Sequence, residues 1–286
     1  MNNSKNKYKI LLTGSNGFVG ARILKKYNNS VTVPAELVRN PDNKLIDFVC
    51  AHKPDIIINA AAISDISVCE ANPDKSFLAN VTLPVVLAKA AKSINAKFIS
   101  FSTDQVYTGC DNFGPYAENM HLPTPTNIYA CHKIQAENEV LNILPESVML
   151  RATWMYDMPM ANHNNRGNFF VNIINSLHEN NTLSFPIQYR GITYVDEVVT
   201  QLENVFTIPG GIYNYGSENS YTSYETAKEL LILLGEAEKS NLIIQTNDIR
   251  HNLWIDNQKI TNFGIKFNTT INGLKQCISD YSLTPK

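Results

Sequence analysis

The residues best suited to catalysis are Tyr129 and Lys133, which lie four positions apart in the segment YACHK. On a helix, residues four apart share one face, so the phenol and the ammonium would be neighbours. A nearby positive charge favours the phenolate, so we expect Lys133 to lower the Tyr129 pKa from about 10 toward neutrality. Such a tyrosine can exchange a proton with a substrate oxygen.

The same spacing occurs a second time, at Tyr224 and Lys228, so spacing alone is weak evidence. Context separates the two pairs. Only the first pair follows an expected strand that ends in hydroxyl residues, Ser102-Thr103, within the half of the chain whose pattern builds a sheet. We therefore interpret Tyr224 and Lys228 as ordinary helix surface.

Glycines at positions 14, 17 and 20 lie between an expected strand and an expected helix. Glycines at such a place allow a tight turn, close approach of the backbone to a pyrophosphate, and close packing of helix on strand. The helix N-terminus adds free N–H groups and the positive end of a dipole. The spacing is one residue wider than the commonest dinucleotide fingerprint, and a structural turn is the alternative. We predict a dinucleotide site.

The choice between NAD and NADP is open in the sequence. An acidic residue after the second strand would bind the ribose hydroxyls of NAD, whereas an arginine would favour NADP. Glu36 and Arg39 both follow that strand, and Arg22 lies in the first helix. The cofactor prediction is therefore NADP or NAD.

The elements that would position these residues alternate between strand and helix. Short apolar runs predict strands at 9–13, 31–33, 55–59, 97–102, 148–151 and 211–216. Helical spacing of apolar residues predicts helices at 18–27, around 45–49, and at 83–91, 129–144, 169–177 and 224–234. This alternation is typical of βαβ units, so we predict an α/β fold with a doubly wound parallel sheet.

The pattern loosens after residue 156, which suggests a smaller, interleaved C-terminal lobe that binds substrate. We expect residues 1–157 to form a cofactor-binding domain whose sheet is completed by residues 188–217. Residues 158–187 and 218–286 would then form the substrate lobe.

Composition excludes several classes of function. The 286 residues carry 24 Lys and Arg against 26 Asp and Glu, a net charge of −2, which argues against nucleic acid or an acidic membrane surface as partner. Five scattered cysteines without a CxxC motif, and six histidines without ligand spacing, predict neither disulfides nor a metal site. A polar start and the lack of a long apolar run favour a cytoplasmic protein.

Several motifs together resemble the extended short-chain dehydrogenase/reductase family, and within it the dTDP-4-dehydrorhamnose reductases. They are TGSNGFVG at 13–20, PDIIINAAA at 54–62, STDQVY at 102–107, the Tyr129/Lys133 pair and RATWMY at 151–156. The likeness covers nearly the whole chain in matching order. It implies a Rossmann-type sheet, and reduction of a 4-keto-6-deoxy nucleotide sugar with NADPH or NADH.

The resemblance also implies residue roles. Tyr129 would protonate the C4 oxygen as hydride arrives, Lys133 would hold the nicotinamide ribose, and Thr103 would hydrogen-bond the substrate carbonyl. The expected cofactor-binding residues are Gly14, Asn16, Gly17, Phe18, Val19, Gly20, Ala60, Ala61, Ala62, Tyr129 and Lys133. The expected substrate-binding residues are Thr103, Asp104, Trp154, Asn168 and Arg190, and Asn80 matches an asparagine that supports the active site.

The sequence departs from the family pattern at positions that bear on the reaction and on the substrate. Related 4,6-dehydratases carry Asp-Glu after the threonine, whereas Gln105 is an amide without acid–base function, which disfavours dehydration. The family's Gln-x-Gly-x-Pro-Thr segment is QYRGIT at 188–193, which lacks the proline. Arg190 in that segment would reach a diphosphate if the lobe folds over the sheet, and is otherwise a surface charge. Trp154 is either a core residue or a platform for the sugar.

Two other functions remain open at this point. One is sugar-nucleotide epimerisation on the same scaffold with tightly held NAD. The other is a non-catalytic, NADP-binding regulatory subunit, because the regulatory β subunit of methionine adenosyltransferase also resembles these reductases. The sequence predicts a nucleotide sugar as partner, and a monomer or a homodimer.

Overall fold

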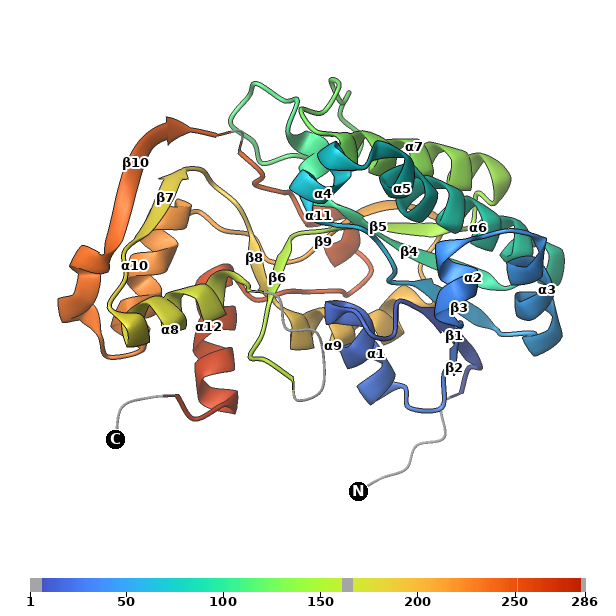
Figure 1. Ribbon diagram of the computed structural model, residues 1–286, viewed down its shortest axis with the longest axis horizontal. Helices are drawn as coiled ribbons and strands as arrows, with labels where there is room; N and C mark the ends of the chain where they lie inside the picture. Colours follow the sequence, from blue (N-terminus) through green and yellow to red (C-terminus); the bar gives the residue numbers. More distant parts are fainter. Residues whose placement is uncertain (1–6, 161–166, 251, 284–286) are drawn as a thin grey trace.

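The structure is a computed structural model that describes residues 7–160, 167–250 and 252–283. Within these residues the central element is a six-stranded parallel sheet with strand order β2-β1-β3-β4-β5-β9 (Figure 1). Its strands are β1 (Ile10–Thr13), β2 (Val31–Thr32), β3 (Ile56–Asn59), β4 (Lys97–Thr103), β5 (Val148–Ala152) and β9 (Gly211–Tyr215). The predicted doubly wound parallel sheet is confirmed.

The short apolar runs form strands because both faces of the sheet are covered. In β1, Ile10 and Leu12 join one hydrophobic cluster while Leu11 joins the cluster on the other face. All three are at most 2% exposed. A strand buried on both sides needs apolar residues at every position, which explains the continuous rather than alternating pattern.

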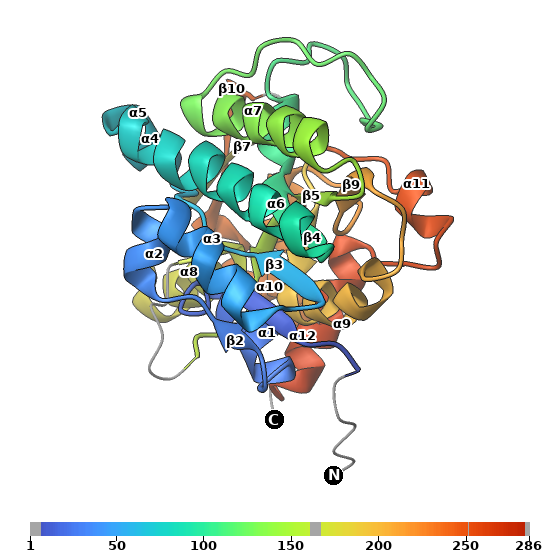
Figure 2. The ribbon, with the colours of Figure 1, turned by 90° about the vertical axis from the view of Figure 1, so that its right-hand side faces the viewer.

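Helices lie on both faces of the sheet (Figure 2). One face packs against α1 (Phe18–Lys26) and α9 (Val195–Val205), and the other against α3 (Asn43–His52), α6 (Leu83–Ile94) and α7 (Ile128–Ile143). The shorter helices are α2 (Ala35–Arg39), α4 (Ile66–Ala71), α5 (Pro73–Phe77) and α11 (Gln258–Thr261). A π-helical segment, Leu78–Thr82, joins α5 to α6.

The later part of the chain gathers beside the carboxyl ends of the strands, at the left of Figure 1. It holds two parallel two-stranded sheets, β6 (Trp154–Tyr156) with β8 (Ile192–Tyr194), and β7 (Leu183–Ile187) with β10 (Ile243–Ile249). Its helices are α8 (Phe169–Glu179), α10 (Ser223–Leu233) and α12 (Thr270–Asp280). Of the segment 188–217, β9 joins the main sheet, whereas β8 pairs with β6. The domain division at 157/158 stays a prediction.

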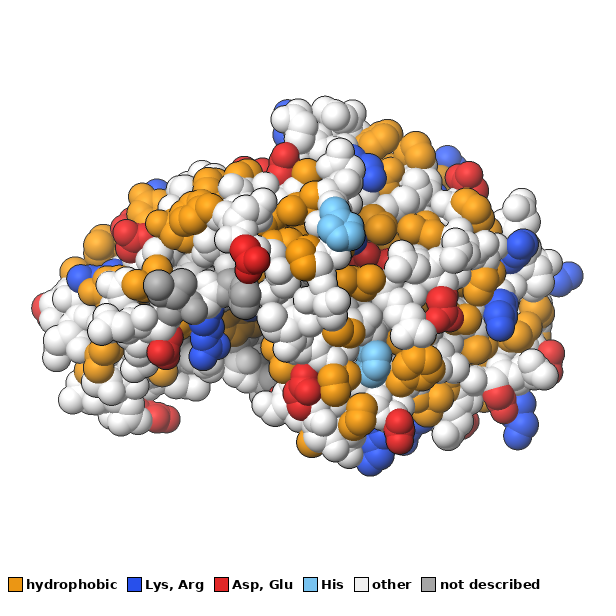
Figure 3. Space-filling model, turned by 90° about the horizontal axis from the view of Figure 1, so that it is seen from above, with side chains coloured by type: hydrophobic (Ala, Val, Ile, Leu, Met, Phe, Trp, Pro, Cys, Tyr) orange, Lys and Arg blue, Asp and Glu red, His pale blue; other side chains and the backbone are white. Residues whose placement is uncertain are grey.

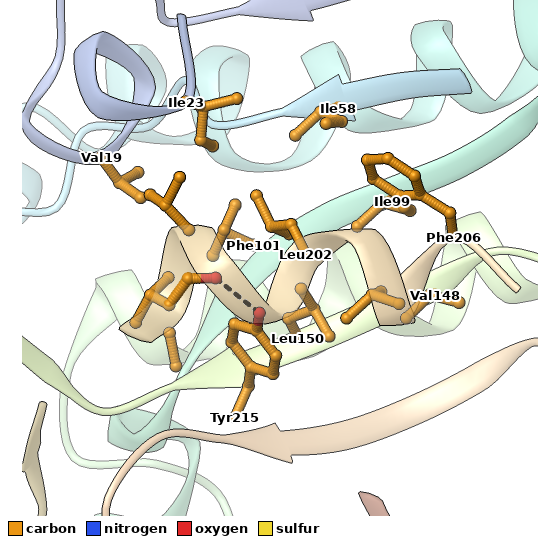
Figure 4. Close-up of a cluster of buried hydrophobic side chains, with 14 of the residues drawn as sticks. Val19, Ile23, Ile58, Ile99, Phe101, Val148, Leu150, Leu202, Phe206 and Tyr215 are labelled. Carbon is orange, nitrogen blue, oxygen red and sulfur yellow. Dashed lines mark hydrogen bonds between the residues drawn. The ribbon is translucent and has the colours of Figure 1, made fainter. Parts of the chain in front are cut away.

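One hydrophobic cluster fills the space between the sheet and the pair α1 and α9 (Figure 4). Leu202 of α9 is fully buried there, and Tyr215 at the end of β9 donates its hydroxyl to the Val198 carbonyl at 2.7 Å. We expect Leu202→Ala to lower the free energy of unfolding by about 2–5 kcal/mol, because it leaves a cavity in the core. Urea unfolding measures this change.

The matched control is Ile232→Ala on α10, because the Ile232 side chain is 56% exposed. Its unfolding free energy should change by less than about 0.5 kcal/mol. Equal losses for the two variants would show that the cluster on α9 is not tightly packed.

Among the described residues, one helical stretch, Pro73–Ile94, has the length and apolar composition to cross a membrane, and half of it is buried inside the molecule. Its second part is α6, which packs against α3, α7, β3 and β4. That is the position of a core helix.

Candidate active site

The glycine loop follows β1 and leads directly into α1. Gly14 has a φ of +71°, which favours glycine, and its carbonyl accepts from Gly17 N at 2.8 Å to close the turn. Gly17 is the N-cap of α1 and has no side chain to cap it, so within the described part of the chain the N-cap position leaves the first N–H groups of the helix uncapped. Asn16 and Gly17 are exposed. The loop therefore has the form of an anion-binding helix N-terminus.

The loop lies where the strand order of the sheet reverses. β1 is flanked by β2 on one side and β3 on the other, and ligands of open α/β sheets bind at the carboxyl ends of the strands at this switch point. A Cβ on Gly14 would come within 2.6 Å of Ala61 N and 2.7 Å of the Ala60 carbonyl carbon. The predicted cofactor segments, 14–20 and 60–62, are thus in direct contact.

Asn80 fixes the segment after β3. Its side-chain oxygen accepts from Ile63 N at 3.2 Å, and its amide donates to Ile63 O at 2.9 Å and to Ser76 Oγ at 3.1 Å. Asn80 is fully buried in the π-helical segment. It therefore holds the Ala60–Ala62 chain in place beside the glycine loop.

Thr103, Tyr129 and Lys133 meet at the end of β4. Asn127 accepts from Ala130 N at 2.8 Å and so begins α7 at Ile128, which places Tyr129 in the first turn and Lys133 one turn later. The three side chains come from residues that are at most 7% exposed. The Thr103 hydroxyl lies next to the Tyr129 side chain. Its Oγ1 accepts from Gln105 N at 3.2 Å and donates to Asp104 Oδ1 at 3.3 Å. Lys133 Nζ donates to the Phe101 carbonyl at 2.6 Å, which ties α7 to β4.

The pKa of Tyr129 differs from the one that the sequence predicts. Burial raises the pKa of Tyr129, and it outweighs the opposing effects of the nearby Thr103 hydroxyl and of the Arg190 charge. Burial also lowers the pKa of Lys133 to about 8. The expectation that Lys133 brings the Tyr129 pKa toward neutrality is therefore wrong here, because desolvation of the phenol dominates. Tyr129 holds its proton at neutral pH.

Asp104, Arg190 and Trp154 come together beside these residues. Asp104 is fully buried, and its two carboxylate oxygens accept from Arg190 Nε at 2.7 Å and Nη2 at 2.9 Å. The Arg190 guanidinium also lies 5.3 Å from the centre of the Trp154 ring, which is 36% exposed. Arg190 is thus a paired, partly buried charge, and Trp154 is a surface residue at the site.

Asn168 has a structural role as well as a place at a cavity. Its Oδ1 accepts from Val171 N at the start of α8, and its Nδ2 donates to the Asp157 carbonyl at 2.8 Å. It lines a cavity of about 270 Å³ together with Phe18, Met158 and other residues. Both polar atoms of its amide are therefore engaged within the protein.

Arg22 forms a buried ion pair that the sequence did not predict. Its guanidinium donates to Asp157 at 2.5 Å and to the carbonyls of Phe18 and Met158. All three nitrogens are used, so Arg22 is not a free partner for a 2′-phosphate. Glu36 and Arg39 are both exposed and lie within α2, after β2. The sequence offered no signal for the Arg22–Asp157 pair, whose members are 135 residues apart.

A second cavity, of about 370 Å³, lies between the loop after residue 109 and the end of β7. Phe113, Tyr189, Arg250 and Asn252 are among its lining residues. Aromatic rings and a guanidinium are groups that hold nucleotide bases and phosphates. The sequence assigned no role to these residues. The one sign of a binding site in it was an arginine near aromatic residues.

On the face seen in Figure 3, Lys and Arg alternate with Asp and Glu without a continuous basic stripe. In the described ranges, no three or more His, Cys, Asp or Glu side chains gather in a way that could hold a metal ion. The second pair, Tyr224 and Lys228, lies on α10, with the ammonium 5.3 Å from the centre of the ring.

Comparison with known proteins confirms the resemblance seen in the sequence. Residues 8–253 match the family model described as the RmlD substrate binding domain. The chain is 26% identical over 234 residues to the dTDP-4-dehydrorhamnose reductase of Aggregatibacter actinomycetemcomitans, covering 77% of this chain and 76% of that protein. It is 25% identical over 230 residues to the spore coat polysaccharide biosynthesis protein SpsK of Bacillus subtilis, covering 78% of each chain.

The fold matches solved structures over nearly its full length. The crystal structure of dTDP-4-dehydrorhamnose reductase from Bacillus anthracis, in complex with NADP, has a TM-score of 0.82 at 21% identity. The match covers 96% of this chain and 99% of that chain. The α/β fold is therefore of the Rossmann type.

Proposed function

The chain belongs to the family of the RmlD substrate binding domain, and we propose that it reduces the C4 keto group of a 4-keto-6-deoxy nucleotide sugar with NADPH or NADH. The observation that carries this proposal is the group of Thr103, Tyr129 and Lys133 at the end of β4, three residues that are each at most 7% exposed. The names of the relatives, dTDP-4-dehydrorhamnose reductases, support the substrate class.

The residues around the switch point fit a dinucleotide. Glycines 14, 17 and 20 let the loop close tightly, because a Cβ at any of them would lie within 3.1 Å of a backbone atom of Gly14, Ala60 or Ala61. The N-cap of α1, Gly17, has no side chain that could cap the helix. The first N–H groups of α1 would hold the pyrophosphate, while Lys133 would hold the nicotinamide ribose. A bound NADPH or NADH supplies the hydride.

The protein's own residues manage the proton. Thr103 and Tyr129 would both hydrogen-bond the substrate carbonyl, which places the phenolic proton at the oxygen that gains negative charge. Lys133, as an ammonium ion on the same helix face, stabilises the phenolate that remains after the transfer. Gln105 Oε1 accepts from the Asn127 side chain at 3.4 Å. Because an amide cannot act as a second acid, these residues suit reduction rather than dehydration.

The sugar and its diphosphate would contact Asp104, Trp154 and Arg190. The exposed Trp154 ring offers an apolar face for the sugar. An incoming diphosphate competes with Asp104 for Arg190, because a guanidinium binds phosphate and carboxylate in the same bidentate way. Release of Asp104 would leave its carboxylate free to accept from a sugar hydroxyl.

We expect Arg190→Ala to raise KM for the nucleotide sugar by about 10- to 100-fold, the effect of losing a hydrogen bond to a charged group. Arg190→Lys should lie between wild type and Arg190→Ala, since it keeps the charge but loses the bidentate geometry. Steady-state kinetics with each variant measures KM. An unchanged KM for Arg190→Ala would remove Arg190 from the substrate site.

The direct test is oxidation of NADPH and of NADH by the purified protein with a panel of 4-keto-6-deoxy nucleotide sugars. Turnover identifies the coenzyme and the sugar together. Stoichiometric NAD that stays bound through a cycle without net oxidation would indicate an epimerase. A stable partner enzyme, together with no turnover on any sugar nucleotide, would indicate a regulatory subunit.

A further inference from the structure

A fully buried ion pair lies behind the Tyr129/Lys133 pair. Glu137 of α7 and Arg151 of β5 are 1% and 3% exposed, and Arg151 Nη2 lies 2.7 Å from Glu137 Oε2. Arg151 Nε donates to Glu137 Oε1 at 3.0 Å, and Arg151 Nη1 donates to the Tyr107 hydroxyl at 3.0 Å. Tyr107 in turn donates to Asn214 on β9 at 2.7 Å. A network of this kind fixes the Glu137 carboxylate in one orientation.

Glu137 and Lys133 hold consecutive residues of the catalytic strand. They lie four apart on α7 and so share one helix face. Lys133 Nζ donates to the Phe101 carbonyl, while the Glu137 carboxylate accepts from Ser102 Oγ at 2.5 Å. The next residue of β4 is Thr103. The two side chains therefore place the end of β4 against α7 at the point where Thr103 meets Tyr129.

Stability alone does not account for this ion pair. A buried ion pair is often no more stabilising than well-packed apolar residues of the same volume, because both charges lose their hydration. Apolar residues at these two positions would leave the buried ammonium group of Lys133 without a compensating negative charge. Lys133 is 2% exposed, and burial disfavours its ammonium form, while the Glu137 charge favours that form.

The other groups around Lys133 supply little negative charge. Cys69 of α4 faces it with a thiol whose pKa is raised by burial, so the thiol stays neutral. Tyr129 on the same helix keeps its proton, and Asp104 after β4 is paired with Arg190. His132 points to Ser76 on α5 at 2.9 Å. Arg151 of β5 is a cation held on Glu137.

We propose that Glu137 is a positioning residue, which keeps Lys133 in its cationic form and aligned on β4. The catalytic meaning of this arrangement rests on the proposed reductase function. The placement and charge of Lys133 can be tested without turnover.

The first test is an NMR titration of the Lys133 side chain, assigned by comparison with Lys133→Arg. Glu137→Gln should lower the midpoint of Lys133 by about one pH unit, because it removes the carboxylate charge that favours the ammonium form. Glu139→Gln, the same change on the same helix at a position bonded to Gln135, should leave the midpoint unchanged. A wild-type midpoint in Glu137→Gln would overturn the proposal.

A second variant separates this role from a structural one. Arg151→Met breaks the same ion pair but removes the cation, so it should raise the Lys133 midpoint. Shifts of opposite sign from two changes that break one contact are not expected of a purely structural pair. Shifts in the same direction would contradict the proposal. Glu137→Asp is the variant to use if either of these two fails to fold. It moves the carboxylate away by one methylene group but keeps its charge. An unchanged Lys133 midpoint in Glu137→Asp would also contradict the proposal.

Turnover supplies an independent readout. If cationic Lys133 is required, activity falls as pH rises through the pKa of Lys133, and Glu137→Gln moves this alkaline limb to lower pH. Activity of the variant should then recover toward wild type at the acidic end of the profile. If no nucleotide sugar is turned over but the Lys133 midpoints move as stated, the proposed function fails and the role of Glu137 stands.

Discussion

Replacing Tyr129 with phenylalanine should lower kcat for the keto sugar by about 10²–10⁴-fold, the contribution of a positioned general acid. The change deletes one hydroxyl, which is the only proton donor of this side chain. The wild-type phenol is protonated at neutral pH, and burial keeps its pKa above the ordinary value of a tyrosine, so the side chain holds the proton that the reaction needs. The rate of NADPH oxidation at saturating substrate measures the loss.

The matched control is Tyr224→Phe, which makes the same change at the other Tyr-x-x-x-Lys pair, on α10. Its kcat should equal that of wild type. Binding of NADPH to Tyr129→Phe, followed by fluorescence, should be retained, which separates loss of chemistry from loss of fold. Reduction by Tyr129→Phe at the wild-type rate would show that another group protonates the product.

Gly20→Ala should weaken binding of NADPH and NADH by at least about tenfold and lower the free energy of unfolding by about 1–3 kcal/mol. Gly20 lies inside α1, where alanine by itself would be favoured by about 0.5–1 kcal/mol. The added Cβ would stand 2.0 Å from Gly14 O and 2.6 Å from Gly14 C. Because these are backbone atoms of the glycine loop, we expect the clash to outweigh helix propensity and to displace the loop.

Urea unfolding and fluorescence titration with each coenzyme measure the two effects. Gly273→Ala in α12 is the control, because a Cβ there would meet only side-chain atoms, the nearest being Glu197 Oε1 at 3.1 Å. Its coenzyme affinity should be that of wild type, and its loss of stability should be smaller. Wild-type coenzyme affinity in Gly20→Ala would show that the glycine loop does not hold the dinucleotide.

Local features of the chain were readable because they depend on residues close in sequence. The apolar run of β1, the glycine loop and the helical spacing of Tyr129 and Lys133 each span at most a few turns of chain. The backbone geometry of the strand and the helix follows from the spacing of their apolar residues, and that of the loop follows from the absence of a side chain on glycine. The same reasoning missed the pairing of β6 with β8, since strand partners depend on how distant segments meet.

The sequence by itself determined the parallel α/β sheet, the glycine loop between β1 and α1, and the candidates Thr103, Tyr129 and Lys133. Only the tertiary structure decided which side chains are paired and which are desolvated. Asp104 meets Arg190 across 86 residues, and Arg22 meets Asp157 across 135. The direction of the Tyr129 pKa also follows from burial by the whole molecule rather than from Lys133 four residues away. Burial and long-range ion pairing are sums over distant segments, which no local pattern in the chain contains.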